Sequence, residues 1–473
     1  MNYDVVVIGG GPPGENAADR AHRGGLSVAL VEHELVGGEC SYWACMPSKA
    51  LLRPVELYAR ARALPGVREA VTGPLDPAAV FKRRDWFVGA DPAKPFGHDD
   101  SGQVQWVEKA GVAFVRGHGR LAGPKTVEVT TPEGETRTLT ADHAVVLATG
   151  TTATIPPVPG LREVHRWTSR EVTNAEKAPR RLIVLGGGVV GCEMAQAMRG
   201  LGSEEVTIVQ HGPRLLPRAE PSASELLRAS FEAAGITVLT GRKATEVRRP
   251  AGEVTLVLDD GRELVADELL VATGRTPSTG ALGLETVGLE PGRYVKVDDS
   301  MHALDGWLYA CGDVTGRNLL THMGKYQARV AGDVIAARAA GKPDDGPGLR
   351  ALADDAWVPQ VVFTDPQVCS VGLTAARAAD RGLRARVVEY DVGKVSGASL
   401  LADDYQGQAT LVVDEDRRVV VGATFVGPDL AELLHSATVA VVGEVPLDRL
   451  WHAVPSYPTV SEIWLRLLET YGL

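Results

Sequence analysis

The chain has 473 residues, of which 44% are hydrophobic and 23% charged, and this balance excludes a disordered or fibrous protein. Its formal net charge of −11 opposes binding to nucleic acid or to an anionic membrane surface. Apolar runs stay far below the roughly 18 residues of a membrane-spanning helix, and no export signal precedes the first strand. We therefore expect a soluble, cytoplasmic protein with no membrane partner. At about 150 residues per domain, the length predicts about three domains.

Residues 5–8 form a short apolar strand, and the glycine-rich turn 9–14 leads from it into a helix expected over residues 15–22. A strand, glycine turn and helix in this order suit a pyrophosphate, because the backbone can approach closely and the helix N-terminus favours negative charge. The next strand, residues 26–31, precedes Glu32, whose carboxylate suits a ribose 2′-hydroxyl. An ordinary tight turn is the alternative for a single motif of this kind. The predicted cofactor contacts are Gly9, Gly11, Gly14 and Glu32.

The whole unit returns later in the chain, as a strand at 182–185, a glycine turn at 186–191, a helix from Cys192 and a strand at 206–209. A second repeated segment ends both units, because VVLATG at 145–150 matches LLVATG at 269–274. The repeat predicts two nucleotide-binding domains nested in one chain. The additional predicted cofactor contacts are Thr149, Gly150, Gly186, Gly188, Gly191 and Gly274.

The two copies differ at the end of the second strand, where Gln210 replaces the acid of the first copy. A carboxylate there would repel a 2′-phosphate, whereas nearby cations would attract one. His211, Arg214 and Arg218 are the candidate cations, so the second site is predicted to prefer NADPH over NADH. A solvated loop face is the alternative for the two arginines.

Five cysteines, at positions 40, 45, 192, 311 and 369, are too few and too uneven for a secreted disulfide framework. Two of them lie in the segment GGECSYWACMPSK at 37–49. On an ideal helix, α-carbons five residues apart are about 8.6 Å apart, beyond the roughly 7 Å limit for a disulfide. Cys40 is therefore expected in a distorted turn, and Pro47 predicts a helix starting near Cys45, whose N-terminus would lower a thiol pKa. Two structural cysteines are the alternative.

The segment 37–49, together with both glycine turns, resembles the pyridine nucleotide-disulfide oxidoreductases, which include glutathione reductase, dihydrolipoyl dehydrogenase and mercuric reductase. Two further signatures are similar to those of this family, namely YACGD at 309–313, with Gly312 and the flavin-binding Asp313, and VVFTDP at 361–366. The resemblance covers nearly the whole chain. It implies an α/β fold with two nested Rossmann-like nucleotide-binding domains and a C-terminal α+β dimerisation domain.

The resemblance also implies the cofactors and the site. FAD would occupy the first unit and NAD(P)H the second. Cys45 would be the thiol next to the flavin, and Cys40 the thiol that meets the acceptor. Lys49 and Glu193 match the family's ion pair near the flavin and the nicotinamide, so Lys49 would also contact a cofactor. An exposed first-turn acid is the alternative for Glu193, and Cys192 and the cysteines at 311 and 369 are expected to be small buried residues.

The C-terminal segment departs from the disulfide-reducing members, which place a histidine where this chain has Tyr457 and keep the acid at Glu462. An unperturbed imidazole titrates near 6.5 and a phenol near 10, so tyrosine is poorly matched to proton transfer at pH 7. His452 could substitute, or could be a packing residue. Mercuric reductases are similar in having tyrosine there, but the chain ends at Leu473 without their vicinal cysteine pair.

These observations predict an FAD-binding domain over residues 1–152 that returns at 276–350, an NAD(P)H-binding domain at 153–275 and a dimerisation domain at 351–473. In the last domain, strands are expected at 361–363, 409–413 and 419–423, and helices at 430–441 and 460–469. The predicted function is that of a homodimeric flavoprotein enzyme. It would pass hydride from NADPH through FAD and a Cys40–Cys45 disulfide to a small-molecule electron acceptor, which is a disulfide, a quinone or a metal ion. The alternatives are a quinone reductase or transhydrogenase with ancillary cysteines, and a dihydrolipoyl dehydrogenase-like subunit of a multienzyme complex.

Overall fold

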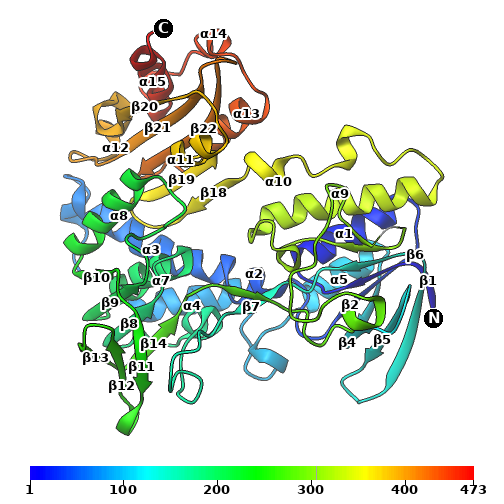
Figure 1. Cartoon of the computed structure of the whole chain (residues 1–473). Helices are drawn as coiled ribbons and strands as arrows, with labels where there is room; N and C mark the ends of the chain where they lie inside the picture. Colours follow the sequence, from blue (N-terminus) through cyan, green and yellow to red (C-terminus); the bar gives the residue numbers. More distant parts are fainter. Residues whose placement is uncertain (305) are drawn as a thin grey trace. The chain divides into compact units, whose positions relative to one another are not determined.

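The computed structural model describes residues 1–304 and 306–473, which form two compact units (Figure 1). Unit 1 comprises Met1–Pro47, Arg84–Ala153 and Arg275–Asp354, and unit 2 comprises Ser48–Arg83, Thr154–Gly274 and Asp355–Leu473. Within the described residues, no helix combines the length and the apolar character that crossing a bilayer requires. The four-segment domain division remains a prediction.

Unit 1 is built on a mostly parallel sheet with the strand order β16-β17-β6-β1-β2-β3. Its central strands are runs of valine, isoleucine and leucine with no exposed side at their centres, as expected for a parallel sheet covered on both faces. β4 and β5 extend the sheet beside β6. The strands are β1 (Asn2–Ile8), β2 (Val28–Glu32), β3 (Ala113–Arg116), β4 (His118–Leu121), β5 (Thr126–Thr130), β6 (Thr136–Leu147), β16 (His302–Leu304) and β17 (Leu308–Ala310).

Helices α1 (Pro12–Arg23) and α9 (Thr321–Ala339) lie side by side in this unit (Figure 1). Small residues allow the close approach, because a Cβ on Gly324 would meet the Pro13 ring at 2.8 Å. The contact brings the first turn of α9 beside the glycine turn that precedes α1. α1 begins three residues earlier than predicted, since proline is tolerated in the first helical turn. The remaining elements of this unit are α2 (Gly38–Tyr42), α5 (Ser101–Lys109), β7 (Thr151–Ala153) and β15 (Arg275–Pro277).

The nucleotide-binding part of unit 2 repeats the pattern with a four-stranded parallel sheet in the order β10-β9-β8-β14. Most of α3 belongs to this unit, and this helix packs closely on α7. A Cβ added to Gly200 of α7 would lie only 2.1 Å from the Val55 side chain of α3. Leu51 and Leu52 of α3 share a core with Met194 of α7. The elements are α3 (Cys45–Ala63), α4 (Pro77–Phe87), α6 (Ser169–Asn174), β8 (Arg181–Leu185), α7 (Val189–Gly200), β9 (Glu205–Gln210), α8 (Pro221–Ala233), β10 (Ile236–Thr240), β11 (Ala244–Arg248), β12 (Val254–Leu258), β13 (Glu263–Ala266) and β14 (Glu268–Val271).

The C-terminal part of unit 2 is an antiparallel sheet in the order β18-β19-β22-β21-β20, with α13 against β19 and β22 and α15 against β20. The predicted helix at 430–441 instead begins at Leu434, because the amides of Leu430 and Ala431 donate to the Gln367 side chain, each at 2.9 Å. The predicted helix at 460–469 opens with a 3-10 turn and continues as α15. The elements are α10 (Ala353–Ala356), which ends across the unit boundary, β18 (Pro359–Val362), β19 (Gln367–Gly372), α11 (Ala375–Asp380), β20 (Ala385–Asp391), α12 (Ser396–Leu401), β21 (Gln408–Asp414), β22 (Val419–Gly427), α13 (Leu434–Val442), α14 (Leu447–Leu450) and α15 (Ile463–Tyr471).

Candidate active site

The first glycine turn, between β1 and α1, has the close geometry that a pyrophosphate cradle needs. Gly9 has a φ of 105°, and a Cβ on Gly14 would meet the Gly9 carbonyl oxygen at 1.8 Å, so no larger residue fits at position 14. Gly11 is the N-cap of α1. Pro12 and Pro13, the first two residues of α1, carry no N–H group, so the Gly11 amide and the positive end of the helix dipole are what this helix start can offer a phosphate.

Glu32 stands at the end of β2, where its buried carboxylate is held by backbone amides. Gly10 donates to Oε2 at 2.6 Å, Glu34 donates to Oε1 at 2.7 Å, and His33 pairs with Oε1 at 3.2 Å. Burial alone would raise the pKa of Glu32, but the hydrogen bonds from His33, Glu34 and Gly10 hold it below its usual value. The carboxylate is thus ionised and fixed, and can accept from a ribose hydroxyl.

Asp313, which opens the 3-10 turn three residues after the end of β17, belongs to a chain of polar contacts within unit 1. Its Oδ2 accepts from Thr151 Oγ1 at 2.9 Å, and Arg275 donates to the same hydroxyl at 2.9 Å. Arg275 also lies 3.5 Å from Glu39, the residue before Cys40. Burial raises the pKa of Asp313, while Thr151 and Arg275 act in the opposite direction.

These residues fit a flavin dinucleotide. Gly14 lets α1 pack tightly on Gly9, a Cβ at the N-cap Gly11 would meet nothing closer than 4.0 Å, and the Thr149 hydroxyl is buried with no hydrogen-bond partner among the described residues. Gly312 is fixed beside Asp313, because the buried Gln327 accepts from its amide at 2.8 Å. A polar ligand would satisfy the Thr149 hydroxyl.

The two cysteines of the segment 37–49 lie together, on either side of a helix break. α2 ends at Tyr42 and α3 begins at Cys45, so Cys40 lies in a separate short turn, as predicted. No disulfide joins them in this structure, and the contact with Cys45 raises the pKa of Cys40. Cys45 Sγ also shares a hydrogen bond of 3.3 Å with Thr321 Oγ1, from the first turn of α9.

The hydrogen bond to Cys45 is the main reason why the pKa of Cys40 is raised, followed by burial and the neighbouring sulfur. Thr321 and Lys325, one turn apart on α9, act in the opposite direction. Cys45 is the first residue of α3, and a helix N-terminus favours a thiolate. The two sulfurs therefore lie in different environments, with Cys45 at a helix start and Cys40 in the preceding short turn.

The second glycine turn reproduces the first. A Cβ on Gly191 would meet the Gly186 carbonyl oxygen at 1.9 Å, and Gly188 is the N-cap of α7. Gln210 takes the place of Glu32, because its Oε1 accepts from the Gly187 amide at 2.8 Å. The second cradle is therefore built in the same way with a neutral side chain at the strand end.

The three predicted cations near Gln210 differ in their surroundings. His211 and Arg218 are exposed, whereas the half-buried Arg214 donates to the carbonyl oxygens of Pro217 at 3.1 Å and Ala219 at 3.4 Å. Arg214 thus braces the loop after β9, while the other two side chains face solvent.

Lys49 and Glu193 form the ion pair that the resemblance implied. Lys49 Nζ lies 2.8 Å from Glu193 Oε2, and Glu193 is only 2% exposed. The alternative of an exposed first-turn acid is wrong, because the packing of α3 on α7 buries this carboxylate. Its other oxygen, Oε1, accepts from the Phe363 amide at 2.9 Å.

The C-terminal candidates lie in a different environment. The Tyr457 side chain is 76% exposed, and His452 is exposed as well. Glu462 is buried, with Oε1 paired to Arg466 at 2.6 Å and with Oε2 unpartnered among the described residues. Exposure of Tyr457 leaves it available to another molecule.

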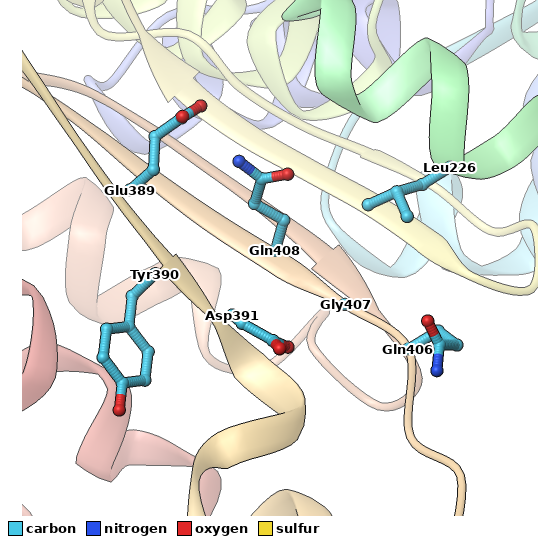
Figure 2. A pocket seen from close by; sticks show the side chains of 7 residues that line it. All are labelled: Leu226, Glu389, Tyr390, Asp391, Gln406, Gly407 and Gln408. Carbon is cyan, nitrogen blue, oxygen red and sulfur yellow. The ribbon is translucent and has the colours of Figure 1, made fainter.

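A pocket of about 360 Å³ lies between α8 and the strands β20 and β21, and none of the predicted site residues lines it (Figure 2). Glu389 and Gln408 lie on the side of the strands that faces Leu226, whereas Tyr390 points to the other face, as strand alternation requires. The lining residues are Leu226, Glu389, Tyr390, Asp391, Gln406, Gly407 and Gln408.

Sequence reasoning missed several residues of the site. Thr321 of α9 lies within hydrogen-bond distance of Cys45, and the charge of Lys325, one turn further along α9, lowers the pKa of Cys40. Glu15 lies at the start of α1, where burial raises its pKa to about 7 against the opposing effect of Lys325. Arg275 directly follows Gly274 of the second repeated segment, which was the one local signal for it. Nothing in the sequence pattern indicated Phe363 as a partner of Glu193.

Comparison with known proteins agrees with this geometry. A sequence model of the family described as pyridine nucleotide-disulphide oxidoreductase matches residues 3–337, and the model of its dimerisation domain matches residues 358–467. Dihydrolipoyl dehydrogenase from Chlorobaculum tepidum is 34% identical over 467 residues, covering 97% of this chain and 95% of that protein. Mercuric reductase from Staphylococcus aureus is 30% identical over 468 residues, covering 98% of this chain and 81% of that protein.

Two solved structures show the same fold. The HOCl-induced flavoprotein disulfide reductase RclA from Escherichia coli matches with a TM-score of 0.83 at 23% identity, covering 99% of both chains. LpdA from Mycobacterium tuberculosis matches with a TM-score of 0.83 at 24% identity, covering 100% of both chains. Two strand–glycine turn–helix units and a neighbouring cysteine pair are the features expected of a flavin- and pyridine nucleotide-dependent oxidoreductase. The chain belongs to the pyridine nucleotide-disulphide oxidoreductase family, whose members are FAD-dependent enzymes.

Proposed function

We propose that the enzyme takes hydride from NADPH and passes two electrons through FAD and the Cys40–Cys45 pair to a small-molecule acceptor. The observation that carries this proposal is the position of the cysteine pair, because Cys45 Sγ lies 3.3 Å from Thr321 Oγ1 of α9, the helix that packs on α1 after the first glycine cradle. When bound, FAD would supply the exchange of electrons between a nicotinamide and a disulfide. Gly9, Gly14 and Glu32 would hold its phosphate and ribose parts.

The cysteine pair can then act as a two-electron relay. Reduction of a Cys40–Cys45 disulfide consumes two electrons and two protons and gives two thiols. Thr321 Oγ1 lies 3.3 Å from Cys45 Sγ and can donate a hydrogen bond to a thiolate there. Cys40, once deprotonated, attacks a disulfide acceptor or donates electrons to a quinone or metal ion, and the Cys40–Cys45 disulfide re-forms.

We also propose that the second cradle prefers NADPH, because a neutral Gln210 stands where Glu32 stands in the first cradle. Gln210→Glu should shift the ratio of kcat/KM for NADPH over NADH by about tenfold toward NADH, since a carboxylate repels a 2′-phosphate. Steady-state kinetics with both nucleotides measure this ratio. An unchanged ratio would show that position 210 does not contact the ribose.

A homodimer is supported by the matched dimerisation domain and by exposed apolar side chains within it. Val439 is 55% exposed, Val442 41% and Val454 85%, and a second copy of the chain would cover such residues. The exposed Tyr457 belongs to the same domain and would lie toward a second subunit, by analogy with the family.

Dihydrolipoyl dehydrogenase activity is the second candidate, favoured by the name of several relatives at 31–34% identity. Tyr457 argues against it, because a tyrosine is poorly matched to accept the proton of a dithiol at neutral pH. Activity with dihydrolipoamide and NAD⁺ would support this candidate directly.

The experiment that tests the proposed function is a screen of NADPH oxidation by the flavin-loaded enzyme with disulfides, quinones and metal ions as acceptors. We expect NADPH consumption that depends on one of these acceptor classes and exceeds the rate with oxygen alone. Absence of turnover with all three classes, together with turnover of dihydrolipoamide and NAD⁺, would replace the proposed function with the second candidate.

A further inference from the structure

The short segment that follows β18, residues 363–365, is fastened to helix α7. The Phe363 amide donates to Glu193 Oε1 at 2.9 Å, and the Asp365 amide donates to Gln196 Oε1 at 2.7 Å. Glu193 and Gln196 are three residues apart and therefore share one face of α7. Ser230 of α8 adds a hydrogen bond of 2.7 Å to the Asp365 carbonyl oxygen. These hydrogen bonds therefore hold residues 363–365 in a fixed position beside the Lys49–Glu193 pair.

The Phe363 side chain meets the other partner of that pair. Lys49 Nζ lies over the ring, 4.9 Å from its centroid, which is within the range of a cation–π contact. The ring is 37% exposed, and the Lys49 side chain is 34% exposed. Phe363 therefore contacts both members of the pair, with its amide on the carboxylate and its ring on the ammonium group.

The remaining contacts of Lys49 show what this arrangement achieves. Its Nζ donates to Glu193 Oε2 at 2.8 Å and, more weakly, to Ser48 Oγ at 3.3 Å. A lysine carries three N–H donors, so the ring on one side and the two acceptors on the others confine a long, flexible side chain to one direction. Without the ring, the ammonium group could turn toward water and lose this orientation.

We propose that Phe363 is a positioning residue for the Lys49–Glu193 pair, so that the C-terminal domain takes part in the nicotinamide half-reaction of its own chain. The predicted effect on reduction by the nucleotide rests on the proposed function, whereas the predicted effect on the orientation of Lys49 rests on the contacts of Phe363 alone. Phe363 would act through Lys49, and loss of the ring would affect reduction by the nucleotide without affecting the delivery of electrons to the acceptor.

Two variants and one control test the proposal. Phe363→Leu keeps the backbone amide and an apolar side chain but removes the aromatic ring, and Phe363→Tyr keeps the aromatic ring. Tyr390→Leu removes an aromatic side chain of the same domain, which points away from Leu226 in Figure 2. Each protein is labelled with a trace of acetic anhydride, and the acetylation of Lys49 is compared by mass spectrometry with that of the surface residue Lys94. The rate of flavin reduction by NADPH and the rate of reoxidation by the acceptor are then measured separately.

In Phe363→Leu we expect Lys49 to be labelled about fivefold faster and flavin reduction to slow about fivefold, with reoxidation unchanged. Phe363→Tyr and Tyr390→Leu should stay within about twofold of the wild type in each measurement. The proposal is overturned if Phe363→Leu labels and reduces like the wild type, if faster labelling leaves flavin reduction unchanged, or if Tyr390→Leu has the same effects. If no form of the protein is reduced by NADPH, the proposed function is wrong, and unchanged Lys49 labelling would then reject the contact itself.

Discussion

Replacing Lys49 with methionine is expected to lower the free energy of unfolding by about 3 kcal/mol and to slow flavin reduction by NADPH roughly 100-fold. The change keeps an unbranched side chain, one heavy atom shorter than lysine, but leaves Glu193, which is only 2% exposed, without its counter-ion. Removing one partner of a buried pair costs about 3–5 kcal/mol, and the partial exposure of Lys49 places this case at the lower end. Thermal and urea unfolding measure the stability, and stopped-flow absorbance measures the reduction.

Two controls separate the buried charge from the lost lysine. The double variant Lys49→Met with Glu193→Gln removes both charges and keeps a side-chain oxygen for the Phe363 amide, so most of the stability should return while flavin reduction stays slow. Arg228→Met breaks the exposed pair with Glu232, whose side chains are 47% and 49% exposed, and should cost less than about 1 kcal/mol. Recovery of rapid reduction in the double variant would contradict a role for Lys49 in the nicotinamide half-reaction.

Cys40→Ser is expected to reduce turnover with the acceptor roughly 1000-fold while flavin reduction by NADPH stays within about threefold of the wild type. Serine is close to cysteine in shape and keeps a group that can form hydrogen bonds beside Cys45. It cannot form a disulfide, so the electrons reach the flavin but cannot leave through the cysteine pair. Steady-state NADPH oxidation with the acceptor and single-turnover reduction without it measure the two effects.

Cys369→Ala is the matched control, because Cys369 is fully buried in the C-terminal core. It should keep at least about half of the turnover, apart from a loss of stability typical of a small core truncation. If Cys40→Ser instead retains a large share of the turnover, the cysteines are ancillary and the enzyme is better described as a quinone reductase or transhydrogenase.

The parts of the fold that depend on local sequence could be predicted closely. The two glycine turns are local patterns, and their repeat predicted that Gly14 and Gly191 occupy equivalent positions, where added Cβ atoms would meet a backbone oxygen at 1.8 and 1.9 Å. The helix start at Cys45 followed from the spacing of two cysteines and a proline. The burial of Cys192 and Cys369 was confirmed as well.

Contacts between distant segments could not be derived in this way. Lys49 and Glu193 are 144 residues apart in the sequence, and only the resemblance to the family paired them. The Phe363 amide, which donates to Glu193, lies 170 residues from it in the sequence. Thr321 and Cys45 are 276 residues apart in the sequence, and they come together because α9, which carries Thr321, packs on α1. Small residues allow this packing, but hydrophobic periodicity does not show which helix such residues will contact. Such contacts depend on how the elements pack, which no single-segment pattern contains.

The most direct test of the central claim is an anaerobic titration of the oxidised, flavin-loaded enzyme with NADPH, followed by absorbance. If the Cys40–Cys45 pair receives the first two electrons, a long-wavelength band from the Cys45 thiolate beside the oxidised flavin should appear after one equivalent, and it should be absent in Cys45→Ala. Full bleaching of the flavin by the first equivalent in the wild type, with no such band, would contradict the cysteine relay.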